Sequence, residues 1–289
     1  MRAARNLWSN GAFRFGAGFL GLVLLVALVA PWLGTVDPAA MDYNNINRAA
    51  GHAGMFTLPD GSQVAHTFWL GTDNFGRDLY SRIIYGARVS LLVSACTALL
   101  ALSVGVLIGM VAGYFRSADL ILMRIMDGLM AIPAILLAIA LVAALGASVA
   151  TVVVAIAVPE IPRVSRLVRS LVLGLREEPF VEAARALATP APLILTRHIL
   201  PNAMAPMLVQ GTFVAASAVL LEAILSFLGL GLPAEIPTWG NIMAEGRTQF
   251  SQYPGNVLYP AMLLVPTVLA FNMLGDGLRD VLDPKFAKR

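Results

Sequence analysis

Charged residues, and the chemistry they carry, are scarce in this chain of 289 residues. Charged side chains make up 13% of it, and the mean hydropathy is +0.77. A soluble domain could not cover so much apolar area with polar surface, so lipid is the expected solvent for most of the chain. The single cysteine, Cys96, lies in an apolar run. It excludes a disulfide framework and is predicted to be a small buried hydrophobe.

The shortage of lysine and histidine excludes familiar reactive sites. The only lysines, Lys285 and Lys288, lie at the C-terminal end, so no G-x4-G-K-[ST] loop exists to hold ATP phosphates. The three histidines are far apart and no H-E-x-x-H occurs, so no metal site is predicted. No G-x-S-x-G occurs, and a membrane-embedded enzyme would need facing polar groups where only isolated acids are found. We therefore expect no catalytic residue and no cofactor held by this chain.

Long apolar runs take the place of such motifs. They predict an all-α polytopic membrane protein with six transmembrane helices, since about 20 apolar residues cross a bilayer. Pro31 directly follows Ala30, the candidate cleavage position of a signal peptide, so the first run is expected to remain a helix. Gly105, Gly109 and Gly113 recur every four residues and predict close helix packing. The expected helices are 15–33, 89–115, 121–144, 149–168, 202–228 and 257–275, with a turn at 145–148 between the third and fourth.

Basic residues set the expected orientation. Fifteen of the twenty Lys and Arg residues fall in segments on the same side as the N-terminus, so both termini are predicted to be cytoplasmic. A turn is expected at Pro59-Asp60-Gly61. The expected organisation is a cytoplasmic tail 1–14, a first helix 15–33, a periplasmic segment 34–88, a five-helix core 89–284 that contains a cytoplasmic loop 171–201, and a cytoplasmic tail 285–289.

A polar stretch at 177–202, EEPFVEAARALATPAPLILTRHILPN, interrupts the apolar runs. Pro179 suits the first turn of a helix, and one face of that helix would carry Val181, Ala184, Leu187 and Ala188.

A second short helix is expected from Pro192 to Leu200, and Pro201 is expected to turn the chain into the fifth span. Two such short helices are marginal alone. Their apolar face is covered either by the protein's own helix ends or by a partner that docks on the hairpin.

The same stretch resembles the cytoplasmic signature loop of bacterial ABC importer permeases, E-A-A-x3-G-x9-I-x-L-P. The matching residues are Glu182, Ala183, Ala184, Leu200 and Pro201. Two positions depart: Ala188 stands where the family has glycine, and His198 where it has isoleucine. A left-handed turn costs alanine about 1–2 kcal/mol, so we expect Thr189-Pro190 to make the turn instead.

Further segments within 66–284 resemble the second permease subunit of dipeptide, oligopeptide and nickel importers. The segments are HxxxLGTDNFGRD at 66–78, SFLGLG at 226–231, WGN at 239–241 and FNxLGDGLRD at 271–280. The resemblance implies the type I ABC importer permease fold in the bacterial inner membrane. It implies short peptides as cargo, with nickel chelates, opines or glutathione-like molecules as alternatives.

The resemblance also implies an assembly. Its other members would be a sister permease, two ATP-binding cassette subunits that hold ATP and Mg, and a periplasmic or lipid-anchored solute-binding protein, all around a chain embedded in membrane lipid. The loop 177–201 would insert into one ATPase subunit. The basic residues form no single patch, so nucleic acid is not an expected partner.

Acids within the spans are costly and therefore suggest function. Glu222, in mid-span, is a candidate for the translocation path, or else makes a structural hydrogen bond to a neighbouring helix. A rival class, an ion-coupled secondary transporter, would use Glu222 and Asp127. On the permease interpretation, Asp127 has a structural role. Glu160, between two prolines, is expected to mark a break in its helix.

Two polar groups flank the spans. Asp73, Arg77 and Asp78 are candidates for contact with the sister permease or the binding protein; alternatively, they cap and anchor the start of the second helix. The second group follows the sixth span, where Asp276, Arg279 and Asp280 are expected to pair with one another at the water boundary.

Overall fold

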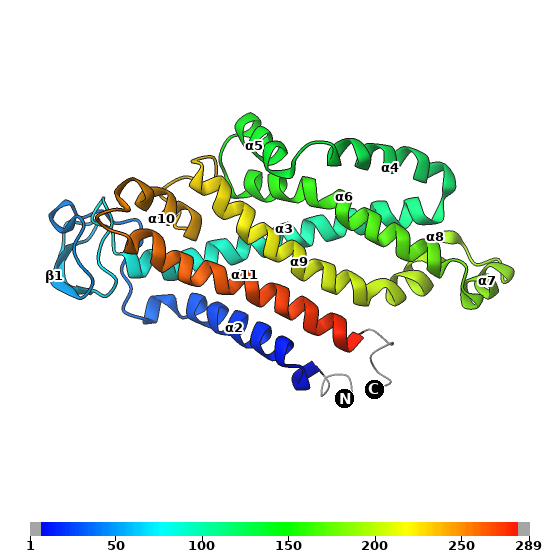
Figure 1. Cartoon of the computed structure of the whole chain (residues 1–289), viewed down its shortest axis with the longest axis horizontal. Helices are drawn as coiled ribbons and strands as arrows, with labels where there is room; N and C mark the ends of the chain where they lie inside the picture. The colour runs from blue at the N-terminus through cyan, green and yellow to red at the C-terminus, as the bar shows by residue number, and fades with distance from the viewer. Residues whose placement is uncertain (1–6, 283–289) are drawn as a thin grey trace.

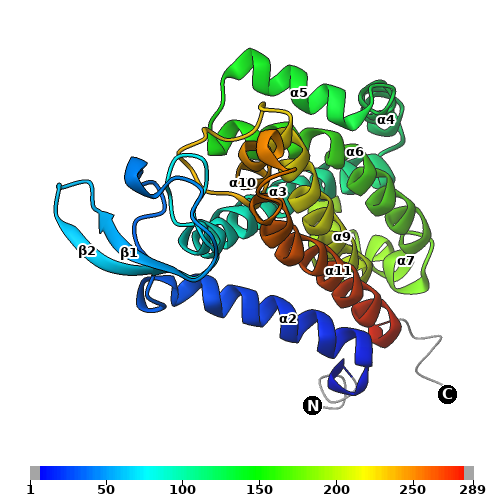
Figure 2. The same ribbon diagram turned by 60° about the vertical axis from the view of Figure 1, so that its left-hand side comes forward.

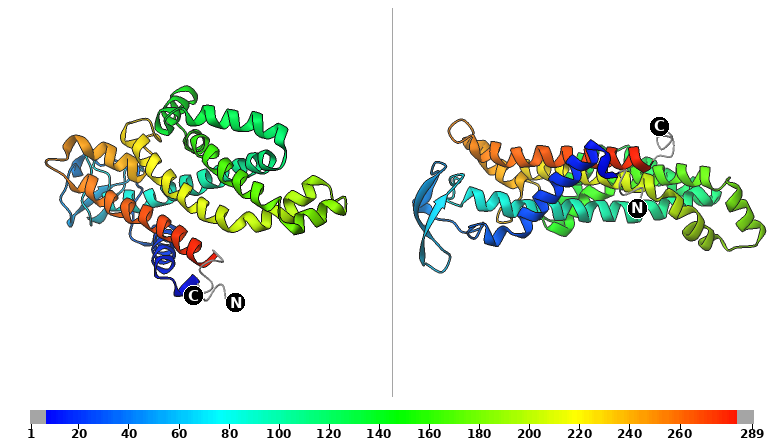
Figure 3. Two further views of the ribbon diagram at one scale, coloured as in Figure 1. Left: turned by 45° about the vertical axis from the view of Figure 1, so that its right-hand side comes forward. Right: turned by 90° about the horizontal axis from the view of Figure 1, so that it is seen from below.

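The computed structural model describes residues 7–282, and the chain forms an elongated bundle of helices (Figure 1). A β-hairpin stands at one end, the strand end, and two short helices stand at the other, the hairpin end (Figures 1 and 3). Residues 1–6 of the expected N-terminal tail and the whole expected tail 285–289 lie outside the described residues.

Five long helices connect or flank the two ends. They are α2 (Gly11–Leu28), α3 (Leu79–Tyr114), α6 (Val149–Leu175), α9 (Leu200–Phe227) and α11 (Gly255–Leu282). Each overlaps an expected span. α2 packs on α11 along the outside of the bundle (Figure 2). α3 begins well before the expected position 89, because Asp78 caps it by accepting a hydrogen bond from the Ser81 N–H.

The packing of α3 against α6 confirms the predicted glycine face. A Cβ atom on Gly105, Gly109 or Gly113 would lie within 2.6 Å of the Cβ atom of Val164, Val168 or Val172, respectively. Only glycine allows the two backbones to approach so closely. Cys96 lies half a turn around α3 from this face and is exposed, so the prediction that it is buried is wrong.

The third expected span, 121–144, is broken into two helices. α4 (Arg116–Met130) and α5 (Ala134–Leu145) meet at an angle of 89°. Pro133 explains the break, because a proline cannot donate the backbone hydrogen bond that would continue α4. The predicted turn at 145–148 is confirmed, since α5 ends at Leu145 and Gly146 has a φ of 83°.

The strand end contains an element that the sequence did not predict. β1 (His52–Thr57) pairs antiparallel with β2 (Gln63–Phe68), and the predicted turn around Gly61 joins them, with a φ of 83° at Gly61. Phe56 and Phe68 are fully buried and meet edge to face. α10 (Trp239–Gly246) covers the same end from the C-terminal half of the chain.

Six spans are not confirmed. Among the described residues, four helical stretches are long and apolar enough to cross a membrane, and α4 with α5 would make a fifth. α6 has 27 residues but carries Glu160, Arg163 and Arg166 in its middle. The break predicted at Glu160 is wrong, because α6 continues through both of its prolines. A membrane helix can continue through proline because neighbouring helices and side chains satisfy the backbone groups that the proline leaves free.

Candidate functional site

The hairpin end is formed by residues 177–201, called here the α7–α8 hairpin. It projects beyond the main bundle, away from the strands (Figure 1). α7 (Pro179–Ala186) begins at its proline, as predicted, and α8 (Ala191–Ile194) follows a short turn. The chain then forms a π-helix at Leu195–Ile199 and passes directly into α9. Pro201 therefore lies in the first turn of α9, and the predicted bend there is wrong.

The base of the hairpin is packed on the protein's own helices. Val181 and Ala184 are buried in the same apolar cluster as Val172 of α6 and Ile199. The guanidinium of Arg185 lies 5.4 Å from the ring centroid of Tyr114, at the end of α3. These contacts fix the hairpin to the ends of α3, α6 and α9, which overcomes the marginal stability of such short helices.

The turn after α7 is made by Ala188 itself. This residue has a φ of +54°. The Ala188 N–H donates to the Arg185 carbonyl at 2.9 Å, and the Thr189 N–H donates to the Ala184 carbonyl at 3.1 Å. This is the Schellman pattern, in which glycine usually occupies the left-handed position. The prediction that Thr189-Pro190 would replace that turn is therefore wrong, and the backbone follows the glycine-containing pattern despite the alanine.

The rim of the hairpin remains uncovered. Leu187 was expected on the buried face but is 82% exposed, and Phe180 and Leu193 are each 40% exposed. Glu182, Ala183 and Ala188 are also exposed, and His198 and Leu200 are partly exposed. Of the two predicted coverings, the protein's own helices account for the buried part of the apolar surface, and covering of the rim by a partner stays a prediction. The protein's own helices bury Val181 and Ala184, while the leucine and phenylalanine side chains face outward.

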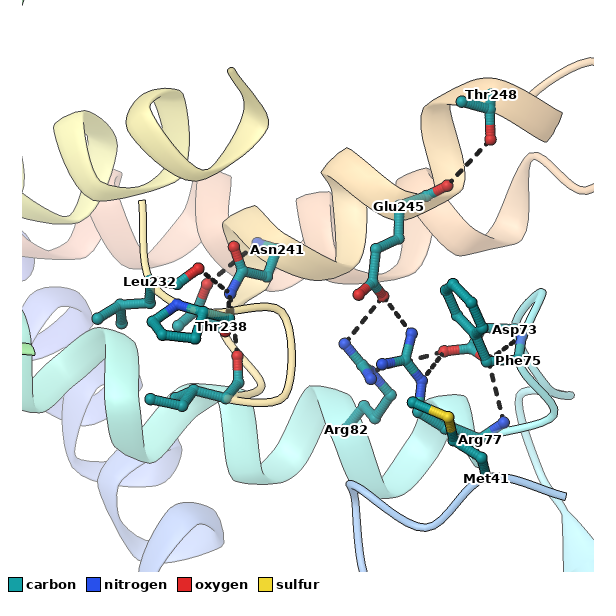
Figure 4. A network of polar contacts seen from close by, with 12 residues as sticks. Met41, Asp73, Phe75, Arg77, Arg82, Leu232, Thr238, Asn241, Glu245 and Thr248 are labelled. Atoms are coloured by element: carbon teal, nitrogen blue, oxygen red, sulfur yellow. Dashed lines mark hydrogen bonds and ion pairs between the residues drawn. The ribbon is translucent and has the colours of Figure 1, made fainter. Parts of the chain in front are cut away.

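An ion cluster occupies the strand end, formed by the buried residues Asp73, Arg77 and Arg82 and by Glu245, whose side chain is 15% exposed (Figure 4). Arg77 donates from Nε to Asp73 at 2.7 Å and from Nη2 to Glu245 at 2.5 Å. Arg82 also donates from Nη2 to Glu245, at 3.0 Å. The two positive and two negative charges balance. Burial raises the pKa of the Glu245 carboxyl, although Arg82 and Arg77 oppose that shift.

The cluster joins segments far apart in the sequence. Asp73 and Arg77 precede α3, Arg82 lies in its first turns, and Glu245 belongs to α10. Sequence reasoning missed Glu245, although it follows Asn241 of the WGN motif by four residues and so lies on the same helix face. Asn241 donates to the carbonyls of Leu232, Pro233 and Ile236, which fixes the loop before α10.

Asp78 caps α3 and is fully buried. Burial raises the pKa of its carboxyl, while hydrogen bonds from Ser81 and the charge of His66 act in the opposite direction. The His66 Nε2 atom lies 3.6 Å from the carboxylate. Asp73, Arg77 and Asp78 are thus all engaged within the chain, which favours the anchoring interpretation over direct contact with a partner.

The acids of the helical bundle have internal partners. Glu222 is fully buried on α9, where it accepts hydrogen bonds from Ser226 at 2.8 Å and from Ser90 of α3 at 3.4 Å. This geometry favours the structural interpretation of Glu222. Asp127 pairs with Arg166 across two helices at 2.5 Å, and Glu160 pairs with Arg163 at 3.2 Å.

The predicted ion pairing among the charged residues after the sixth span is wrong. No ion pair joins Asp276, Arg279 and Asp280 in the described part of the chain. Asp280 instead accepts a hydrogen bond of 3.2 Å from Asn10, the residue that caps α2. The two termini of the bundle are therefore linked through α2 and α11.

The chain is similar to known membrane components of transport systems. The family of binding-protein-dependent transport system inner membrane components matches residues 105–288, and the N-terminal TM domain of oligopeptide transport permease C matches residues 1–50. A putative peptide transport system permease protein of Brucella abortus is 45% identical over 98% of this chain and 90% of its own length. The dipeptide transport system permease protein of Alkalihalophilus pseudofirmus is 43% identical, over 98% and 89%.

A solved structure shares the fold. The MetNI methionine ABC transporter, in an inward-facing conformation, aligns with 71% of this chain and 98% of its own chain at a TM-score of 0.57 and 18% identity. Together with the family match, this similarity establishes a multi-pass helical permease with the type I ABC importer fold. The chain belongs to the family of binding-protein-dependent transport system inner membrane components.

Proposed function

We propose that this chain is the permease subunit of an ATP-driven importer for di- and oligopeptides, located in the bacterial inner membrane. The observation that carries the proposal is the α7–α8 hairpin: its base is fixed to three long helices and its apolar rim is left open. The names of the two relatives, which refer to peptide and dipeptide transport, support the cargo class. Nickel chelates, opines and glutathione-like molecules are the alternative cargoes.

The proposed topology has six spans and cytoplasmic termini. α6 serves as a span because 27 helical residues extend about 40 Å, more than the thickness of the hydrocarbon core. Its charges are compensated by α4, where Asp127 pairs with Arg166 and Asp119 pairs with Arg169. The strand end then faces the periplasm and the hairpin end faces the cytoplasm, as the basic residues predict.

The α7–α8 hairpin couples the permease to an ATPase subunit. Leu187 and Phe180 supply apolar contact area, and Glu182 supplies a charge that a basic residue of the partner would recognise. Movement of the ATPase would reach the membrane because the base of the hairpin cannot slide on α6 and α9 without exposing Val181 and Ala184. The chain itself contributes no ATP chemistry, and ATP and Mg belong to the partner subunits.

The remaining partners follow from the same proposal. A sister permease would complete the translocation path, because the described helices form a packed bundle. A solute-binding protein would deliver cargo at the strand end. The ion cluster there is internal, so it would hold the docking surface in place while other residues make the contact.

The competing proposal is an ion-coupled secondary transporter. It would use Glu222 and Asp127 as titrating groups, but Glu222 is hydrogen-bonded inside the bundle and Asp127 is paired with an arginine. Peptide uptake by the reconstituted complex distinguishes the two. Vanadate, which arrests ABC ATPases, should abolish uptake, and a protonophore should leave it unchanged. Uptake that resists vanadate and stops with the protonophore would establish the secondary transporter.

A further inference from the structure

One outward face of α9 carries polar side chains among apolar ones that include Phe213 and Leu220. Asn202 is exposed, and Pro206, Gln210 and Ser217 are partly exposed. At about 100° per residue, these four positions fall within an arc of roughly 80° around the helix. They run from the hairpin end to beyond the middle of a helix that is apolar and long enough to cross a membrane.

This face is distinct from the one that holds Glu222. Glu222 lies roughly 120–140° around α9 from Gln210 and Ser217, on the side that packs against Ser90 of α3. The acid is therefore directed into the bundle, while the amide and the hydroxyl face outward.

Of the three polar side chains on this face, Asn202 donates to the His198 carbonyl at 2.6 Å, whereas Gln210 and Ser217 have no partner within the described residues. Neither Gln210 nor Ser217 makes a side-chain hydrogen bond there, in contrast to Glu222, Ser226 and Ser90. An amide without a partner in hydrocarbon costs several kcal/mol. Such side chains face either another protein chain or a water-filled cavity rather than lipid.

A second observation comes from α6, which packs against α9. Arg163 lies in the middle of α6, and its side chain is 58% exposed. Its partner, Glu160, is almost fully buried, so the guanidinium projects outward from the pair. A cationic side chain this exposed at membrane depth is unfavourable in lipid and is well satisfied by a water-filled cavity.

We propose that the Asn202–Gln210–Ser217 face of α9 forms one wall of the peptide pathway. The amide of Gln210 and the hydroxyl of Ser217 both donate and accept hydrogen bonds, which suits the alternating N–H and C=O groups of a passing peptide backbone. Neutral groups would serve peptides of different sequence, because they recognise the backbone and place no demand on side-chain charge. This inference rests on the proposed importer function and assigns it residues other than Glu222.

The test uses cysteine accessibility, which the sequence makes convenient. Replacing Cys96 with Ala removes the single cysteine of the chain. Gln210→Cys and Ser217→Cys are then introduced singly into the assembled complex, together with control variants Val265→Cys and Leu269→Cys. The control positions lie on α11 and are 62% and 50% exposed, so they are at least as open as the test positions but lie on an apolar face.

A membrane-impermeant methanethiosulfonate reagent should modify positions 210 and 217 at least tenfold faster than the two control positions. Saturating trialanine, supplied with the binding protein during turnover, should slow that modification. Modification at control rates would overturn the proposal, as would disulfide cross-linking of position 210 to the sister permease with no reagent access, since the face would then be an interface between subunits.

Transport gives a second readout. Gln210→Leu, which keeps a helix-forming side chain of similar size, should reduce trialanine uptake at least threefold while ATP hydrolysis by the complex continues. Unchanged uptake in that variant would also overturn the proposal. Failure of the importer function itself is recognised separately, because the unsubstituted complex would then show no vanadate-sensitive peptide uptake at all.

Discussion

The two ends of the molecule use their polar and apolar residues in opposite ways. At the strand end, four charged side chains from three segments pack against one another, three of them buried and Glu245 partly buried, and each has an ion-pair partner within the chain. At the hairpin end, the base is packed and the rim is open, with Leu187 82% exposed. The charges of the first arrangement balance within one subunit, whereas we propose that the rim of the second binds another protein.

The ion cluster at the strand end therefore has a structural role, and the α7–α8 hairpin is the region proposed for coupling. A buried, neutral ion cluster resists change because removing any member leaves a charge without a partner. On the proposed function, a hairpin with a fixed base and an open rim would transmit the movement of the partner that binds it. We therefore expect substitutions at the strand end to affect folding and substitutions on the hairpin rim to affect partnership.

The largest effect is expected from Glu245→Ala. The substitution leaves Arg77 and Arg82 buried without their shared partner, which should cost about 3–5 kcal/mol of folding free energy. Thermal unfolding of the purified protein in detergent measures the loss. Glu235→Ala is the matched control, since Glu235 is exposed, lies in the loop before α10 and should tolerate the change. Equal stability of the two variants would contradict the account of the ion cluster.

The seam between the two ends should be nearly as sensitive. In Gly109→Ala the added methyl group would lie 2.6 Å from the Ser165 carbonyl oxygen and from Val168, so α3 and α6 must separate. We expect a loss of about 1–3 kcal/mol from this overpacking. Gly128→Ala in α4, where the methyl group meets nothing within 4 Å, is the control. A Gly109→Ala protein with unchanged thermal stability would show that the close approach is dispensable.

On the hairpin rim, Leu187→Asp should leave the fold intact and weaken binding to the ATPase subunit. Loss of one well-packed leucine is worth about 1.4 kcal/mol or more, which is at least tenfold in the dissociation constant. Val181→Asp makes the comparison, because a charge at this buried position should disrupt the hairpin itself. Co-purification measures association, and thermal unfolding measures the fold. Wild-type association by Leu187→Asp would remove the rim from the interface.

The smallest effect is expected at the turn. Ala188→Gly removes the strain of a left-handed alanine and should raise stability by about 1 kcal/mol without loss of transport. Ala183→Gly, within α7, should instead lower stability by about 1 kcal/mol. If both substitutions destabilise the protein equally, Ala188 does not adopt the left-handed conformation.

The sequence predicted the parts of the fold that depend on local pattern. Apolar runs located the long helices, and the glycine spacing predicted the α3–α6 seam. Contacts between distant segments were not predictable in this way. Glu245 joins residues more than 160 positions earlier, so no local pattern connects it to Arg77 or Arg82.

Two corrections have specific physical causes. Leu187 follows the helical period of the buried face, but α7 ends at Ala186, so the period no longer holds at Leu187. The turn at Ala188 follows from hydrogen bonds that tertiary packing of the hairpin maintains despite the strain. Both wrong predictions concern the end of α7. The periodic pattern of a sequence specifies the ends of a helix less well than its middle.

The ratio of peptide imported to ATP hydrolysed tests the central claim most directly. It would be measured in proteoliposomes that contain the full complex, with the chain either unsubstituted or carrying Glu182→Lys, and with Glu235→Lys as the control. We predict that Glu182→Lys continues to hydrolyse ATP while peptide uptake falls, so that the ratio drops at least tenfold, and that the control is unchanged. An unchanged ratio in a stably assembled Glu182→Lys complex would contradict the coupling role of Glu182.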